Sequence, residues 1–175
     1  AFSVEGENNE PVENAEITIA GYEPLFTNDI GTATIDLPNG DYTYQVSATC
    51  YHIYNGTFEV ANSSQMVEVT LNALPEPVFV SGQDMLCEGA TETYAAETEG
   101  NLTMIYTIVN GTAAVDPTTG EVTNITDDFT IRATASFADG CEKYTDLEVT
   151  VNPIPTPAIS TTDPLVWTEG EDISV

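Results

Sequence analysis

The sequence predicts an all-β fold built from β-sandwiches. Apolar and polar residues alternate with period two in short segments rich in Thr, Val, Ile and Tyr. Turn dipeptides separate these segments, and no stretch has helical periodicity. Short strands at this spacing are typical of sandwiches rather than of α/β folds.

The strongest strand predictions come from strict alternation. Residues 15–19, 41–47 and 66–71 each place apolar or aromatic side chains on one face and polar ones on the other. Turns are predicted where a dipeptide favours the positive φ of a tight hairpin. These dipeptides are Asn39-Gly40, Asn55-Gly56, Asn110-Gly111 and Asp139-Gly140.

Closely spaced prolines predict the domain boundaries, because they hold a linker extended and semi-rigid. They occur at 75–77 and 153–157. We therefore expect one domain over 1–74 and a second over 75–154. Pro75-Glu76-Pro77-Val78 recurs as Pro155-Thr156-Pro157-Ala158. The recurrence predicts that residues 155–175 are the truncated start of a further repeat.

The charge excludes several classes of partner. The chain has 29 acidic and two basic residues and a net charge of −27. Nucleic acid binding needs clustered Lys and Arg, and docking on anionic lipid needs the same. No apolar run approaches the length of a membrane span, so direct membrane insertion is not expected.

The acidity itself has two interpretations, which are compatible. Carboxylates over the whole surface keep a protein soluble and prevent self-association. Clustered carboxylates are also the ligands that Ca²⁺ prefers, although no cluster has EF-hand spacing. The candidate calcium ligands are Glu5, Glu7, Asp127, Asp128, Glu169, Glu171 and Asp172.

Residues 2–72 carry three motifs in a fixed order: 11–17 (PVENAEI), 27–33 (TNDIGTA) and 37–46 (LPNGDYTYQV). In this order they resemble the carboxypeptidase-regulatory-like and Cna-B-like family. The resemblance implies a small prealbumin-like sandwich. The chain departs from the family pattern at Cys50-Tyr51, where the family usually has Gly-Tyr.

Residues 75–152 carry a second, weaker set of motifs. These are the Pro75-Glu76-Pro77 start, Cys87-Glu88-Gly89, Gly120-Glu121-Val122, Asp139-Gly140-Cys141 and the strand-like segment 147–151. The set resembles the PKD-like or immunoglobulin-like repeats of large surface proteins in Bacteroidetes-type bacteria. The resemblance implies a second sandwich, a disulfide between Cys87 and Cys141, and a role in a stalk or adhesin.

The cysteine count leaves the pairing open. Three cysteines give one pair and a leftover thiol, or no pair. Cys50 and His52 lie two residues apart and would share a face of a strand. A metal or catalytic site needs further ligands that no motif supplies, so we expect Cys50 to be buried and His52 to lie at the surface.

The sequence therefore predicts tandem immunoglobulin-like and prealbumin-like sandwiches that form a non-catalytic structural or adhesive segment of a secreted bacterial cell-surface protein. Its expected partners are neighbouring repeats, with surface polysaccharide or another cell-surface protein as candidate ligands. One alternative is a carbohydrate-binding module of a secreted enzyme, in which Tyr residues and Trp167 stack on sugar. Another is a fibre subunit whose segment 155–175 is donated to a neighbour.

Overall fold

The computed structural model describes residues 1–156, which form β-strands and no helix. The predicted all-β fold of tandem β-sandwiches is confirmed. The predicted third repeat falls almost entirely on 157–175, which lie outside the described residues. No helix in the described part of the chain could span a membrane.

The first half of the chain forms two sheets that face each other. One has the order β4-β1-β7 and contains a parallel pair, β1 with β7. The other has the order β3-β2-β5-β6 and is antiparallel. The strands are β1 (Phe2–Gly6), β2 (Glu16–Ile19), β3 (Leu25–Phe26), β4 (Thr32–Ala33), β5 (Gly40–Ser47), β6 (Tyr54–Val60) and β7 (Val67–Leu71).

An aromatic cluster fills the space between these sheets. Tyr44 and Val46 of β5 point inward and are buried, as the alternation of 41–47 predicts. The Phe2 ring packs edge-to-face on Tyr44 and Phe58, with centroid distances of 5.2 and 5.5 Å. These contacts join both sheets into one core, since Phe2 belongs to β1 and the other two rings to β5 and β6.

The predicted turn at Asn55-Gly56 is wrong, because both residues lie inside β6. Gly56 is paired with Tyr44 across the sheet. A Cβ atom on residue 56 would lie 2.5 Å from the Tyr44 ring. Glycine is therefore present here to make room for an aromatic side chain, which is one of the reasons for glycine in a strand.

The second half of the chain has a larger sandwich. Its main sheet has the order β12-β15-β16-β9, and two smaller sheets, β11-β8 and β10-β14-β13, complete it. The strands are β8 (Val78–Ser81), β9 (Met85–Cys87), β10 (Glu92–Thr93), β11 (Ala95–Glu97), β12 (Met104–Asn110), β13 (Ala114–Val115), β14 (Glu121–Thr123), β15 (Phe129–Ser136) and β16 (Glu142–Asn152).

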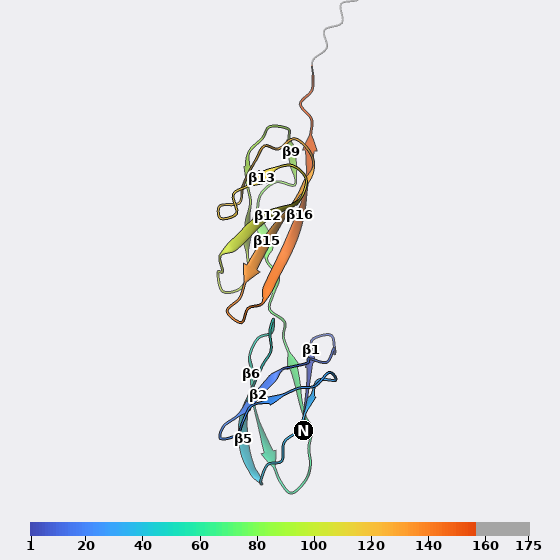
Figure 1. Ribbon diagram of the computed structural model, residues 1–175, viewed down its shortest axis with the longest axis vertical. Coiled ribbons are helices and arrows are strands. Elements are labelled where there is room, and N and C mark those ends of the chain that lie inside the picture. Colours follow the sequence, from blue (N-terminus) through green and yellow to red (C-terminus); the bar gives the residue numbers. More distant parts are fainter. Residues whose placement is uncertain (157–175) are drawn as a thin grey trace, which may run out of the picture.

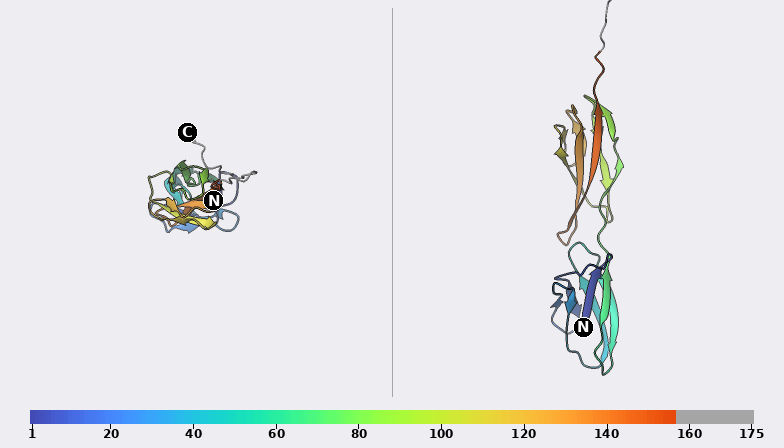
Figure 2. Two further views of the ribbon diagram at one scale, coloured as in Figure 1. Left: turned by 90° about the horizontal axis from the view of Figure 1, so that it is seen from above. Right: turned by 90° about the vertical axis from the view of Figure 1, so that its right-hand side faces the viewer.

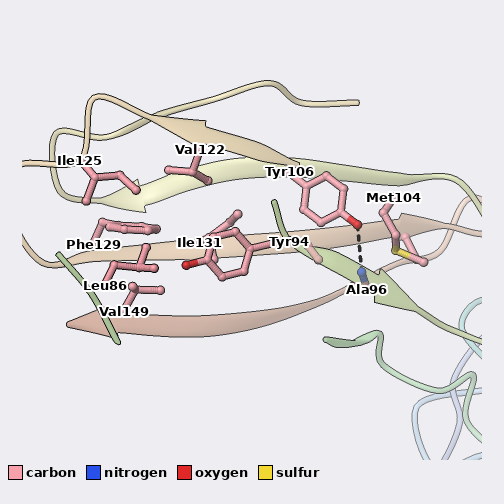
Figure 3. Close-up of a cluster of buried hydrophobic side chains, with 12 residues drawn as sticks. Leu86, Tyr94, Ala96, Met104, Tyr106, Val122, Ile125, Phe129, Ile131 and Val149 are labelled. Atoms are coloured by element: carbon pink, nitrogen blue, oxygen red, sulfur yellow. Dashed lines mark hydrogen bonds between the residues drawn. The ribbon is translucent and has the colours of Figure 1, made fainter. Parts of the chain in front are cut away.

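Strict alternation along β15 builds the second core. Phe129, Ile131 and Ala133 are buried, while the residues between them face outward. Figure 3 shows Phe129 and Ile131 in one cluster with Tyr94 and Tyr106. The Tyr106 hydroxyl accepts a hydrogen bond of 2.9 Å from the backbone N–H of Ala96, so the buried phenol is paired.

The two sandwiches lie end to end, which gives the described chain an elongated shape (Figures 1 and 2). Each has its own hydrophobic cluster, and no strand pairing in residues 1–156 joins them. We call them the N-terminal and C-terminal sandwiches. Their exact limits at 74 and 154 stay a prediction.

The two cores make a direct prediction about stability. Replacing Ile131 with Ala should lower the free energy of unfolding by about 2–5 kcal/mol, because the side chain is fully buried and leaves a cavity. Ile105→Ala is the matched control, since Ile105 is 45% exposed on neighbouring β12, and it should cost less than about 0.5 kcal/mol. Urea unfolding of both variants measures the difference. Equal losses in the two variants would contradict this core assignment.

Candidate functional site

A disulfide joins the two sandwiches. Cys50 of the N-terminal sandwich is bonded to Cys141 of the C-terminal sandwich, with an S–S distance of 2.01 Å and a Cα–Cα distance of 5.0 Å. Cys50 lies in the turn after β5, and Cys141 directly precedes β16. The crosslink spans 91 positions of sequence and fixes the ends of the two sandwiches to each other.

The expected Cys87–Cys141 disulfide is therefore wrong. Cys87 ends β9 and is paired with Asn152 at the end of β16, whereas Cys141 stands just before the start of that strand. An 11-residue strand places its two ends roughly 30 Å apart. A disulfide needs Cα atoms within about 7 Å. Cys87 is exposed and has no disulfide partner in the described part of the chain.

Cys50 occupies an unusual backbone conformation. Its φ is +70°, in the left-handed region that favours glycine. A glycine at this place in the resembling family would meet the same backbone requirement. Cys50 is half-buried in a turn rather than buried on a strand face, which corrects the expectation from sequence. The turn aims its sulfur at the other sandwich.

The Asp139 carboxylate forms a second bridge across the junction. Its Oδ1 accepts a hydrogen bond of 3.0 Å from the Cys141 N–H, and its Oδ2 accepts one of 2.8 Å from the Cys50 N–H. Hydrogen bonds from these two N–H groups, that of Cys141 above all, hold the pKa of Asp139 below its usual range. One ionised side chain thus binds the backbone of both disulfide cysteines.

Further contacts hold the linker and join His52 to the C-terminal sandwich. The Leu74 N–H donates to the Cys50 carbonyl at 2.8 Å, and the Thr98 hydroxyl donates to the Pro75 carbonyl at 3.2 Å. His52 lies at the surface, where its Nε2 is 3.4 Å from a carboxylate oxygen of Glu99. The linker is therefore hydrogen-bonded to both sandwiches. His52 pairs with Glu99 of the C-terminal sandwich and forms no metal or catalytic pair with Cys50.

A groove of about 560 Å³ lies beside the disulfide. Phe26, Ile53 and Leu74 line it from the N-terminal sandwich and the linker, and Phe137 and Asp139 line it from the β15–β16 turn. Phe26 and Ile53 are 61% and 60% exposed and lie in the same groove, where adjacent exposed apolar side chains form a patch. The groove exists only because the two sandwiches are held together at this place.

The predicted calcium ligands do not come together. No group of three or more His, Cys, Asp or Glu side chains that could hold a metal ion occurs in residues 1–156. The Asp128 carboxylate accepts the Val151 N–H at 2.7 Å, and Asp127 accepts hydrogen bonds from neighbouring Thr hydroxyls. Glu5 and Glu7 lie on β1 and the turn that follows it. The remaining candidates, Glu169, Glu171 and Asp172, lie outside the described residues.

Several of the tyrosines considered for an aromatic platform have structural roles, while Tyr22, Tyr54 and Tyr144 are exposed. Tyr44, Tyr94 and Tyr106 are buried in the cores, and Tyr42 packs on Phe58. Burial and neighbouring carboxylates raise the pKa of Tyr94 to about 12, which agrees with a structural phenol. Trp167 lies outside the described residues.

Sequence reasoning did not identify the junction, although Cys50 in place of the family's glycine was a signal for it.

The sequence matches no protein-family model and no curated protein. Among solved structures, the TIE protein of Bacillus anthracis is similar at 15% identity with a TM-score of 0.43, over 87% of this chain and 32% of that chain. Drosophila N-cadherin EC1–4 is similar at 13% identity with a TM-score of 0.35, over 87% of this chain and 48% of that one.

Human desmocollin-1 is similar at 12% identity with a TM-score of 0.35, over 88% of this chain and 38% of its ectodomain. This chain thus spans about a third to a half of the length of these solved chains. At such low identities and TM-scores, the similarities assign no ligand or activity to it.

The Asp139 bridge predicts a pH-dependent junction. A lowered folded-state pKa stabilises the fold above the unfolded value of about 3.9, and that contribution is lost as the pH falls through the folded-state pKa. The amide proton shifts of Cys50 and Cys141 should therefore titrate together below about pH 4. Asp139→Asn should remove this titration, because an amide has no charge to lose.

Asp116→Asn is the matched control. Asp116 accepts N–H bonds from Thr118 and Thr119 within the C-terminal sandwich, and its pKa is lowered for the same reason. That variant should leave the Cys50 titration unchanged. An unaltered Cys50 titration in Asp139→Asn would show that the carboxylate does not bridge the junction.

Proposed function

We propose that this chain is a non-catalytic, extracellular segment of a bacterial cell-surface repeat protein, in which it acts as a rigid spacer within a stalk or adhesin. The observation that carries the proposal is the Cys50–Cys141 crosslink between two sandwiches arranged end to end. A disulfide persists in oxidising compartments outside the cytosol. The resemblance of residues 2–72 and 75–152 to domains of bacterial surface proteins supports the same proposal.

The junction is built to resist bending. Sandwiches joined by a linker alone are expected to move relative to each other. Here the disulfide and the Asp139 bridge both act at Cys50 and Cys141, and the His52–Glu99 pair adds a contact two residues along the chain. These contacts restrict bending more than a linker alone would, which is what a spacer under load needs.

The charge suits crowding of many copies on one surface. With a net charge of −27, neighbouring copies repel one another, so stalks stay separate.

The chemistry of the junction points away from catalysis. The Cys50 sulfur is bonded in the disulfide and is not a nucleophile, and His52 is paired with Glu99.

Small-angle X-ray scattering tests the spacer function. In a Cys87→Ser background, the oxidised chain should scatter as a stiff, elongated particle. Adding Cys50→Gly and Cys141→Ser removes the crosslink but keeps a residue suited to the positive φ at position 50. This variant should show a broader distribution of interdomain distances, because the sandwiches can then bend about the linker.

Each sandwich should keep its own core in both proteins, and circular dichroism checks this. A compact particle in the oxidised state would contradict the spacer function. So would equal flexibility with and without the crosslink.

A further inference from the structure

The groove at the junction is a composite surface with walls from both sandwiches. Phe26 comes from edge strand β3, Ile53 from the segment before β6, and Phe137 from the β15–β16 turn. Its volume of about 560 Å³ is sufficient for several side chains of a ligand. No side chain of residues 1–156 covers Phe26 or Ile53, each of which leaves more than half of its surface in water.

The rim of the groove is acidic. Glu16 and Asp139 line it beside the apolar side chains, together with His52, whose imidazole is paired with Glu99. Neither basic side chain lines it: Arg132 is held by Asp146 at 2.7 and 2.8 Å on the outer face of the main sheet, and Lys143 borders a separate cavity beside Glu76. A positively charged ligand would therefore meet carboxylates and no Lys or Arg at this rim.

The groove is also preorganised. The disulfide and the Asp139 bridge fix the β15–β16 turn against the Cys50 turn, so the walls are already in place before a ligand arrives. A rigid site binds a ligand more tightly than a mobile one, because less conformational entropy is lost on binding. This stiffness serves the spacer and the groove alike.

We propose that the junction groove binds an extended segment of a partner protein that carries basic and large apolar side chains. The apolar side chains would cover Phe26, Ile53 and Phe137, and the basic ones would face Glu16 and Asp139. This inference rests on the proposed function, to which it adds the chemistry of the partner. It assigns adhesion to the junction itself rather than to another part of the protein.

Fluorescence anisotropy with synthetic peptides tests it. The probe is a labelled octapeptide of alternating Lys and Leu. Two matched peptides replace Leu by Ser, or Lys by Glu, and so remove the apolar groups or reverse the charge. The Lys/Leu peptide should bind the oxidised chain at least about tenfold more tightly than either matched peptide. Raising the salt concentration should weaken its binding.

Variants of the chain locate the site. Phe26→Ser with Ile53→Ser should weaken binding of the Lys/Leu peptide about tenfold or more, because the peptide loses its apolar contacts. Both side chains are largely exposed, so the variant should keep its fold. The control pair Ile105→Ser with Val109→Ser changes apolar side chains that are each 45% exposed on β12, and it should bind as the parent does.

The junction variant Cys50→Gly with Cys141→Ser should also weaken binding, since it frees one wall of the groove. Equal binding of the Lys/Ser and Lys/Leu peptides would overturn the inference and indicate general charge attraction. Unchanged affinity in the Phe26/Ile53 variant would overturn it too. A stiff rod in scattering that binds none of the peptides would leave the spacer function intact and remove only the groove as its adhesive site.

Discussion

The crosslink between Cys50 and Cys141 is the constraint on which the arrangement of this protein depends. Each sandwich has its own core, and within residues 1–156 neither contributes a strand to the other. The disulfide turns two independent bodies into one elongated body and places the Asp139 carboxylate against the Cys50 backbone. The groove, the His52–Glu99 pair and the fixed linker all follow from this placement.

Position 50 shows how a local backbone requirement is combined with a long-range bond. The turn after β5 needs a positive φ, which costs little for glycine and roughly 1–2 kcal/mol for other residues. Cys50 adopts this conformation despite the unfavourable backbone energy. The Asp139 hydrogen bond to its N–H and the crosslink through its sulfur both act in the folded state to offset it. A residue that is unfavourable for its own turn is thus favourable for the junction.

The fold class and most strong strands could be predicted from sequence, because alternation over 15–19, 41–47 and 66–71 reports burial directly. The structure at Asn55-Gly56 could not be predicted in this way, because glycine is needed there to make room for the Tyr44 ring on another strand. The disulfide was assigned wrongly for a related reason. Pairing depends on which ends of two sandwiches meet, and a motif within one domain carries no information about the next. Calcium binding was one interpretation of the acidic composition, which does not report whether carboxylates converge.

The most direct test of this account is disulfide mapping of the native chain. Free thiols are alkylated first, an acid-directed endoprotease then cleaves the unreduced protein, and mass spectrometry identifies the linked peptides. The account predicts one crosslinked pair containing Cys50 and Cys141, with Cys87 alkylated. A Cys87–Cys141 link, or alkylation of all three cysteines, would contradict it, because the two sandwiches would then be joined by the linker and weak contacts alone.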